Sequence, residues 1–404
     1  MTPSKHSQAD TDRLTILLAG DTFPPDVNGA ANFTERLAIG LAERGHDVHV
    51  LAPAASRKHG TFLEEHGGST LTVHRLKSTR WPLHDWLRFA TPWKVRPQAG
   101  ELLDRLRPDV VHIQSHVVIG RGVTKAAAER GIRLIATNHF MAENLIEHTG
   151  LPHVVRPTAI RLAWNDASKT LRQMSAITTP TQRAATFLEN TVDVHDVLAI
   201  SCGIKASDYV ARTDRPRENR IVFVGRVTGE KQIDVLLRAM TKLDPALDAT
   251  LTIIGGGDLL KQLQQMAVDL GIGNRVTFAG YASDTDLRRT LTDSAVFAMP
   301  STAELQSIAS LEAMASGLPI VVADAMALPH LVDEGKNGHL FRPGDADDLA
   351  AKLTHVLTLD DDAYLDMRRA SLAMIEGHDI DRTVSVFESL YRGQPVAEAI
   401  RQGR

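Results

Sequence analysis

The sequence predicts an α/β fold made of two doubly wound parallel-sheet domains of similar size. Short apolar runs rich in β-branched residues alternate with amphipathic helical patterns along most of the chain. A polar and charged stretch at residues 203–219 interrupts this alternation, and a second series of the same kind follows it. The length of 404 residues also exceeds what a single hydrophobic core usually supports.

The first series begins with a strand–helix–strand unit. LTILLAG (14–20) has the continuous apolar character of a buried parallel strand, and NFTERLAIGLAERGH (32–46) has the spacing of an amphipathic helix. DVHVLAP (47–53) predicts the next strand, so the unit closes as a right-handed crossover. Further strands are predicted at 70–76, 109–115, 132–139, 176–181 and 197–201.

The second series follows the 203–219 stretch, which we interpret as an interdomain connection. Its strands are predicted at 220–226, 249–256, 275–281, 295–300 and 319–324. The predicted domains are residues 1–203 and 204–380, and the segment 381–404 contributes a terminal helix at 381–393. Ligands of doubly wound sheets bind beyond the carboxyl ends of the strands, so we expect the active site in a cleft between the domains.

Composition narrows the class of protein. With 43% hydrophobic and 23% charged residues the chain is typical of soluble globular proteins. A net charge of −4 gives no indication of nucleic-acid binding. Residues 1–12 are polar and do not resemble a signal peptide, and no apolar run of about 18 residues predicts a membrane-spanning helix. The single cysteine, Cys202, excludes an internal disulfide and favours a cytoplasmic location.

Two cations follow the first strand of the second series. In VGRVTGEK (224–231), Arg226 stands at the carboxyl end of the strand and Lys231 at the start of the next helix. Both can reach one anionic group above the sheet, where the helix N-terminus adds partial positive charge. The alternative is two ordinary surface cations with a solvated ion pair at Glu230.

Two carboxylates, Glu304 and Glu312, follow a later strand in PSTAELQSIASLEAMASGLP (300–319). A carboxylate accepts hydrogen bonds from vicinal hydroxyls such as those of a ribose or a hexose. A helix that begins near residue 304 would place both on one face. A helix that begins after Gln306 would instead leave Glu304 on a loop and Glu312 deeper in the fold.

The start of this helix also offers backbone N–H groups. Those of Gln306, Ser307 and Ile308 would lack partners within the helix and could bind phosphate or sugar oxygens. The alternative is a purely structural helix start, capped by Ser301 or Thr302.

Two candidates lie in the first domain. Gly29, within the turn Asn28-Gly29-Ala30, allows close approach of backbone to a ligand. His139, just past a predicted strand, has a side chain suited to bind a sugar hydroxyl. The alternative for Gly29 is an ordinary turn between a strand and a helix. The alternative for His139 is that it has no special role among the chain's 17 histidines.

Several other patterns predict no cofactor or metal. The run 255–257 (GGG) lacks the spacing of a dinucleotide fingerprint. Asp284-Thr285-Asp286 and the aspartates at 360–362 fit helix starts better than a metal site. Zinc and esterase motifs are absent from the sequence.

In their order along the chain, these pieces resemble the retaining glycosyltransferases of family 4, which have the GT-B fold. The resemblance covers nearly the whole chain and is strongest over 220–340. There a strand followed by G-R-x4-K precedes IIGGGD, VTFAGY, P-S-x-x-E-x7-E-A-M-A-x-G-x-P and N-G-x-L-F. The ordered set is specific, although each member alone is not.

The resemblance implies two Rossmann-like domains that face each other across a cleft. The first would bind the acceptor and the second the nucleotide sugar, with the last helix crossing back to the first domain. The implied reaction moves a hexose from a UDP-glucose-like or GDP-mannose-like donor to a lipid or glycan. It would retain the α configuration, require no metal or cofactor, and let the diphosphate take the acceptor proton.

The resemblance also implies roles for individual residues. Those in the second domain are Arg226 and Lys231 on the donor diphosphate, Glu304 beside the transferred sugar, Glu312 on the ribose, and the backbone of Gln306, Ser307 and Ile308 on sugar and phosphate. In the first domain, Gly29 would line the phosphate side and His139 would approach the sugar and the acceptor.

The sequence departs from the family pattern in three places. Ala30 stands where a second glycine is usual, and Cys202 stands where asparagine is frequent. We expect Cys202 to be a packed structural residue and not a reactive one. After Glu304, Gln306-Ser307 replaces phenylalanine-glycine, as in the branch that makes diacylglycerol glycolipids.

A lipid acceptor would require contact with a membrane. Residues 78–96 combine three tryptophans with arginines and a lysine, and 156–173 form a second basic amphipathic stretch. These segments predict peripheral contact with an anionic membrane on its inner face, and internal packing is the alternative. Other functions left open are a sugar-nucleotide epimerase or phosphorylase of similar fold, and an inactive nucleotide-sugar-binding protein.

Overall fold

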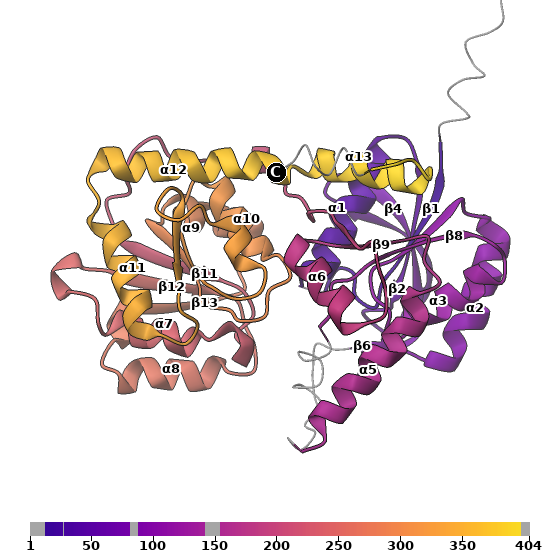
Figure 1. Cartoon of the computed structure of the whole chain (residues 1–404), viewed down its shortest axis with the longest axis horizontal. Helices are drawn as coiled ribbons and strands as arrows, with labels where there is room; N and C mark the ends of the chain where they lie inside the picture. The colour runs from indigo at the N-terminus through magenta and orange to yellow at the C-terminus, as the bar shows by residue number, and fades with distance from the viewer. Residues whose placement is uncertain (1–12, 27, 81–87, 142–153, 397–404) are drawn as a thin grey trace, which may run out of the picture. The chain divides into compact units, whose positions relative to one another are not determined.

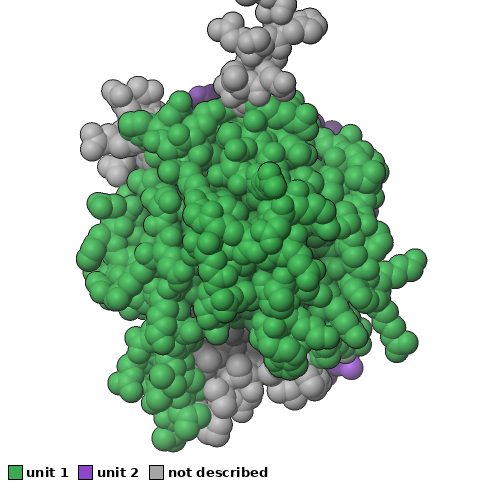
Figure 2. Space-filling model, turned by 90° about the vertical axis from the view of Figure 1, so that its right-hand side faces the viewer, with its two compact units in different colours: residues 1–203, 380–404 green, residues 204–379 purple. Residues whose placement is uncertain are grey.

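The computed structural model of the chain contains two compact units (Figures 1 and 2). Unit 1 comprises Met1–Gly203 and Ile380–Arg404, and unit 2 comprises Ile204–Asp379. The residues that the structure describes are 13–26, 28–80, 88–141 and 154–396.

Unit 1 is built on an eight-stranded sheet with the order β10-β9-β8-β7-β1-β2-β4-β3. Neighbouring strands are parallel except for the antiparallel pair of β3 and β4. The chain runs outward from β1 through β2 on one side and from β7 on the other, so the strand order reverses between β1 and β7. The strands are β1 Thr15–Ala19, β2 Asp47–Pro53, β3 Gly60–His66, β4 Ser69–Leu76, β7 Val110–Ile113, β8 Arg133–Thr137, β9 Ala176–Thr179 and β10 Leu198–Ala199.

The helices of unit 1 cover this sheet (Figure 1). The predicted helix at 32–46 begins earlier, at Gly29, because the Asn28 side chain caps it by accepting a hydrogen bond from the Ala31 amide at 2.9 Å. The helices are α1 Gly29–Glu43, α2 Pro92–Leu106, α3 Ile119–Ala128, α5 Arg156–Leu171, α6 Gln182–Thr191 and α13 Ile380–Tyr391.

Three strands of unit 1 have no counterpart in the sequence prediction. Strand β3 lies at the sheet edge, and most of its residues are exposed or half-buried, so it lacks the apolar run of a central strand. Strands β5 (Ser78–Arg80) and β6 (Arg88–Ala90) form a separate antiparallel pair of three residues each. Short or edge strands carry too few buried positions to give a periodic signal.

The terminal helix α13 packs on helix α1 and on the sheet of unit 1. Gly40 of α1 permits close approach, because a Cβ atom there would lie 2.7 Å from a methyl carbon of Val384. Glu388 pairs with Arg44 and accepts from His46 at 2.7 Å. Residues 380–391 therefore complete unit 1, although they follow unit 2 in the sequence.

Unit 2 contains a six-stranded, fully parallel sheet in the order β13-β12-β11-β14-β15-β16. Here the strand order reverses between β11 and β14. The strands are β11 Arg220–Val224, β12 Thr250–Ile254, β13 Val276–Gly280, β14 Val296–Met299, β15 Ile320–Ala323 and β16 Gly338–Phe341. The helices are α7 Ile233–Met240, α8 Leu260–Asp269, α9 Asp284–Thr292, α10 Ile308–Ala315, α11 Ala346–Thr358 and α12 Asp361–Ile375.

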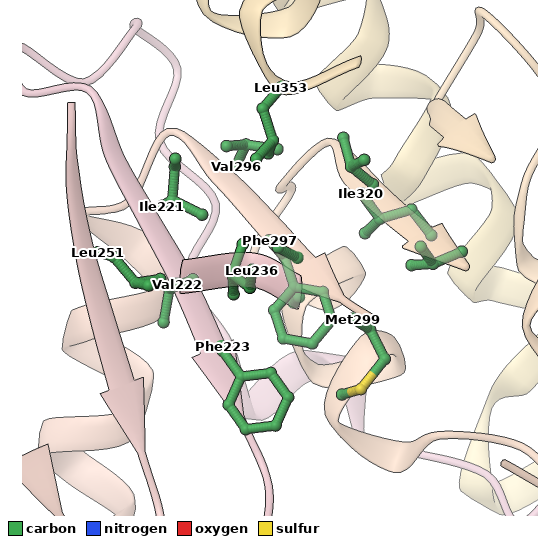
Figure 3. Packing of buried hydrophobic residues seen from close by; sticks show 14 of the residues in the cluster. Ile221, Val222, Phe223, Leu236, Leu251, Val296, Phe297, Met299, Ile320 and Leu353 are labelled. Atoms are coloured by element: carbon green, nitrogen blue, oxygen red, sulfur yellow. The ribbon is translucent and has the colours of Figure 1, made fainter. Parts of the chain in front are cut away.

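The core of unit 2 fixes the two strands that flank this reversal. Side chains of β11, such as Phe223, and of β14, such as Phe297 and Met299, are buried among those of the covering helices (Figure 3). Buried apolar area stabilises such a core by roughly 25 cal/mol per Å². The carboxyl ends of β11 and β14 are therefore held at fixed positions side by side.

Within the described ranges, no helix is both long and apolar enough to cross a membrane.

Candidate active site

The reversal in unit 2 brings the two sets of predicted donor-site residues together. Lys231, in the loop after β11, forms an ion pair with Glu304, in the loop after β14. Both side chains are only 12% exposed, so the pair is largely shielded from water. Ligands of doubly wound sheets bind at such a reversal of strand order, because the loops diverge there and leave room. The structure thus places this pair where a ligand of the sheet is expected.

Arg226 follows β11 and is held by a buried carboxylate. Its guanidinium donates to Glu230 Oε1 at 3.1 Å, and the Thr228 hydroxyl donates to the same oxygen at 2.7 Å. Burial opposes the charge on Glu230, but the bond from Thr228 and the charge of Arg226 outweigh it and lower the pKa of the carboxyl. The alternative of a solvated pair at Glu230 is therefore wrong, since its side chain is only 6% exposed.

The three glycines at 255–257 support Arg226 from the neighbouring loop. A Cβ atom on Gly255 would lie 1.9 Å from the Gly225 carbonyl oxygen, and one on Gly257 would lie 2.4 Å from that of Val227. Their φ values of +130° and +158° also favour glycine. The Val227 amide donates to the Gly256 carbonyl at 2.9 Å. The glycine run packs one loop against the other and orients the residue between Gly225 and Val227.

Glu304 lies in the loop after β14 and not on the helix that follows. Helix α10 begins at Ile308, so Glu304 lies on the loop before it, and its carbonyl accepts from the Ala327 amide at 3.1 Å. Ser301 and Thr302 do not cap this helix. Instead the Thr302 amide donates to the Glu230 carbonyl at 3.0 Å, which joins this loop to the loop after β11. The alternative in which Ser301 or Thr302 caps this helix is therefore wrong.

Ser307 caps α10 in a left-handed conformation. Its φ is +71°, and its hydroxyl accepts from the Ser310 amide at 3.4 Å. The amides of Gln306, Ser307 and Ile308 lie at the start of α10, at the end of the helix that carries partial positive charge. Glu312 lies on α10 and is also largely buried, at 8% exposed.

A partly open cavity of about 150 Å³ lies at the reversal in unit 1. His139 lines it from the loop after β8, Gln114 from the loop after β7, and Gly20 and Asp21 from the loop after β1. The His139 Nε2 atom lies 3.0 Å from Gln114 Oε1. Burial lowers the pKa of His139 to about 3, so its imidazole is neutral at physiological pH.

Asp21 joins the loops of this cavity. It accepts hydrogen bonds from the Ser115 hydroxyl and, at 2.8 Å, from the Ile119 amide at the start of α3. Burial raises the pKa of the carboxyl against these bonds. Gln114 and Asp21 were not identified from the sequence, because both act through partners that are remote along the chain.

Gly29 is the first residue of α1 and is exposed, and the next residue, Ala30, lines the cavity. The structure therefore brings the start of α1 close to His139 within unit 1. Gly29 and His139 belong to unit 1 and the other predicted site residues to unit 2.

The weaker sequence signals have structural roles. Ser283 caps α9, so the aspartates at 284 and 286 lie in its first turn, and Asp360 caps α12. Among the described residues, no group of three His, Cys, Asp or Glu side chains could hold a metal ion. Cys202 is buried, which raises its pKa to about 12 and confirms a packed, unreactive thiol.

A second hollow, of about 650 Å³, lies between α2 and α3 of unit 1. Trp93 on its rim is 78% exposed. Of its cations, Arg96 pairs with Glu129 and Arg121 with Asp166. The lining residues are Pro92, Trp93, Arg96, Pro97, Val117, Val118, Arg121, Gly122 and Lys125. The other two tryptophans of the predicted membrane segment lie at 81–87, outside the described residues.

Comparison with protein families gives two adjoining matches. Residues 27–208 match the model described as Glycosyltransferase Family 4, and residues 209–372 match that of the glycosyl transferases group 1. The boundary between the two matches lies within a few residues of the boundary between the units.

Individual relatives agree with these matches. The sulfoquinovosyl transferase of Arabidopsis thaliana is 26% identical over 82% of this chain, and the alignment spans 64% of the plant protein. A GDP-mannose-dependent alpha-mannosyltransferase of Mycolicibacterium smegmatis is 27% identical over 85% of this chain and 89% of its own length.

Solved structures of similar fold cover nearly the whole chain. Sucrose-phosphate synthase from Thermosynechococcus elongatus has a TM-score of 0.77 at 17% identity, with 94% of this chain and 99% of that chain covered. Anabaena HepE in complex with UDP and glucose has a TM-score of 0.73 at 19% identity, with 94% and 100% covered. At such identities the likeness shows the fold, which is GT-B.

Proposed function

The chain belongs to the family 4 glycosyltransferases, and we propose that it is a retaining, metal-independent hexosyltransferase. Its donor is a nucleoside-diphosphate sugar of the UDP-glucose or GDP-mannose kind, and its acceptor is a lipid or glycan. The single observation that carries this proposal is that the pairs Arg226–Glu230 and Lys231–Glu304 both lie at the strand reversal of unit 2.

Two cations at this position suit a departing diphosphate. Negative charge develops on the leaving oxygen as the glycosidic bond breaks, and preorganised positive charge stabilises it. Arg226 offers a planar, permanently charged guanidinium, oriented by Glu230, and Lys231 offers a compact ammonium. In the proposal these two side chains do the work that a metal ion does in other transferases.

The ion pair of Lys231 with Glu304 supports separate binding roles for the two side chains. When the diphosphate binds Lys231, the carboxylate of Glu304 is released to accept hydrogen bonds from hydroxyls of the transferred sugar. The amides of Gln306, Ser307 and Ile308 bind sugar and phosphate oxygens, and the buried Glu312 binds the ribose.

Retention of configuration follows if the acceptor attacks from the face that the diphosphate leaves. The bond from the anomeric carbon to the diphosphate oxygen breaks, and a bond to the acceptor oxygen forms on the same face. The acceptor's proton passes to the departing diphosphate, so no separate protein base is needed.

Unit 1 is proposed to receive the acceptor. His139 binds a hydroxyl in the cavity of about 150 Å³, next to Ala30 and the exposed Gly29. Val117 lines both this cavity and the hollow between α2 and α3, so the two are neighbours. A bipartite acceptor could therefore use both.

The hollow between α2 and α3 suits the anionic head group of a lipid. Trp93 is mostly exposed, and an aromatic ring beside cations is typical of membrane surfaces. Lys125 adds a charge to those of Arg96 and Arg121. We propose that the enzyme acts at the inner face of an anionic membrane. Substitution of Lys125 by Glu should weaken flotation with anionic vesicles, whereas the exposed Lys58→Glu should not.

The proposal is tested by incubating the full-length protein with UDP-glucose or GDP-mannose, with and without a diacylglycerol acceptor. We expect release of nucleoside diphosphate that depends on acceptor, and a product whose one-bond carbon–proton coupling at the anomeric centre identifies an α linkage in NMR. A β-linked product would contradict retention. Conversion of the sugar without release of diphosphate would favour an epimerase, and binding without turnover an inactive protein.

A further inference from the structure

The imidazole of His139 is held on two sides within unit 1. Its Nε2 atom lies 3.0 Å from the side-chain oxygen of Gln114. Its ring packs against Phe33 of α1, with centroids 5.0 Å apart. These contacts fix both the position of the ring and the environment of one of its two nitrogens.

The amide of Gln114 is itself oriented by a third residue. Its nitrogen lies 3.2 Å from each ring nitrogen of His112, which is fully buried on β7. A neutral imidazole has an acceptor nitrogen to which an amide N–H can donate, whereas an amide oxygen has no proton to donate to it. The amide therefore keeps its nitrogen toward His112 and its oxygen toward His139.

His112 is in turn fixed by hydroxyl groups from two other elements. Its Nδ1 atom lies 2.8 Å from the hydroxyl of Tyr391 on α13, and its Nε2 atom lies 2.7 Å from the hydroxyl of Thr137 on β8. Its ring also stacks on Phe387 of α13, with centroids 5.0 Å apart. A continuous polar chain thus leads from α13 through His112 and Gln114 to His139.

We propose that Gln114 is a positioning residue that sets the tautomer of His139, with the proton on Nε2 and the lone pair on Nδ1, and that α13 holds Gln114 in place through His112. A carbonyl oxygen only accepts hydrogen bonds, so the nitrogen that faces it must carry the proton. In a neutral imidazole the other nitrogen is then an acceptor.

This inference rests on the proposed function, in which His139 contacts a substrate hydroxyl. With its lone pair on Nδ1, His139 accepts a hydrogen bond from a hydroxyl in the cavity and does not donate one. A hydroxyl that donates to Nδ1 keeps its oxygen lone pairs available for other contacts. The substrate group at this position is thereby specified as a hydroxyl, because an ether or a carbonyl oxygen has no proton to give.

This series of side-chain contacts also gives α13 a role beyond packing on the sheet. Phe387 and Tyr391 reach His139 by two routes, because Phe33 packs on Phe387 at 5.8 Å as well as on His139. A change confined to the Tyr391 hydroxyl should therefore reach the tautomer of His139 without touching the cavity.

The direct test is the tautomer of His139 in the full-length protein, read by two-bond 1H–15N correlation NMR of 15N-histidine-labelled samples. His139→Gln identifies the signal. We expect the form protonated at Nε2 in the parent and loss of that preference in Gln114→Leu. A parent protonated at Nδ1, or an unchanged tautomer in Gln114→Leu, would overturn the proposal.

Tyr391→Phe tests the distal end of the chain, with Tyr364→Phe as a matched control. Both tyrosines are buried, but Tyr364 lies in unit 2 and donates to the Ala295 carbonyl at 2.7 Å. Tyr391→Phe should add signal from the other tautomer and Tyr364→Phe should not. An equal response, or none in Tyr391→Phe, would remove α13 from the proposal.

Turnover supplies a second readout that a merely structural role would not give. Gln114→Leu should lower kcat/KM about tenfold in the parent but less than about twofold in a His139→Ala background, because it acts through His139. Equal losses in both backgrounds would contradict the proposal. A protein that shows the expected tautomers but no turnover with any nucleotide sugar would instead overturn the proposed function.

Discussion

The carboxyl edges of the two sheets share a topology and differ in chemistry. At the reversal in unit 2, the charged side chains form two ion pairs, Arg226 with Glu230 and Lys231 with Glu304. At the reversal in unit 1, His139 is neutral and held by the uncharged Gln114, while Asp21 in the same cavity accepts hydrogen bonds that join the loops. Unit 2 is thus suited to a ligand whose charge changes during reaction, and unit 1 to one recognised through hydroxyls.

The largest effect should come from the charged edge. Substitution of Arg226 or Lys231 by Ala should lower kcat at least about a hundredfold, as for loss of one group that stabilises developing charge. The control is Arg238→Ala, which removes an exposed cation of α7 that pairs with Asp234. Turnover at the parent rate in Arg226→Ala or Lys231→Ala would show that this edge does not bind the diphosphate.

The neutral edge should give a smaller and different loss. His139→Ala removes one hydrogen bond to a hydroxyl, so kcat/KM should fall about tenfold, with little change in the affinity for free nucleoside diphosphate. Steady-state kinetics and titration with nucleoside diphosphate measure the two quantities. A comparable loss of diphosphate affinity would mean that His139 belongs to the charged site.

Acid should also distinguish the units. Burial lowers the pKa of His112 and His139 to about 3 and that of His74 and His116 to about 4, and all four lie in unit 1. Between pH 6.5 and about pH 4, these four histidines become protonated in the unfolded chain but stay mostly neutral in the folded protein. Their contribution to stability is therefore complete above pH 6.5 and falls toward pH 4, by up to about 1.4 kcal/mol per pH unit for each histidine. The raised pKa of Asp21 offsets a part of this near pH 4.

Tryptophan fluorescence isolates this effect, because all four tryptophans lie within residues 1–203. The melting temperature followed by fluorescence should fall between pH 7 and pH 5 by more than that followed by circular dichroism, which reports both units together. Equal shifts of both transitions would argue against neutral histidines as the cause.

The smallest expected effect concerns the start of α10. Ser307 has a φ of +71°, which costs a non-glycine residue roughly 1 kcal/mol, whereas glycine as an N-cap is only a few tenths worse than serine. Ser307→Gly should therefore raise stability by about 0.5 kcal/mol. Ser307→Ala keeps the strain and loses the cap, so denaturant titration should show a loss of about 1 kcal/mol. The reverse order would mean that the hydroxyl outweighs the strain.

Much of the fold follows from patterns in the sequence. Every strand predicted from an apolar run is present, because buried parallel strands are apolar along their whole length. The edge strand β3, with its exposed charges, and the short β5 and β6 leave no such pattern. The start of α10 could not be chosen from spacing, since it depends on the left-handed backbone of Ser307.

The grouping of the candidate site residues could be predicted only where they lie in loops that follow strands. Arg226, Lys231 and Glu304 stand at strand ends, and parallel strands bring their ends to one edge. The burial of Glu230 and the contacts of Gln114 depend on loops from other strands, which no local pattern encodes. The sequence therefore indicated which groups carry charge, and the structure adds the groups that orient them.

The most direct test of the central claim is calorimetric titration of nucleoside diphosphate in excess chelator. UDP, GDP and ADP are screened first by thermal shift, and the one that binds is titrated into the parent, Arg226→Ala, Lys231→Ala and His139→Ala. We predict binding to the parent without metal, a loss of at least about tenfold in each of the two cation variants, and an unchanged Kd in His139→Ala. Binding that requires added magnesium, or an unchanged Kd in both cation variants, would contradict a diphosphate site built from the cations of unit 2.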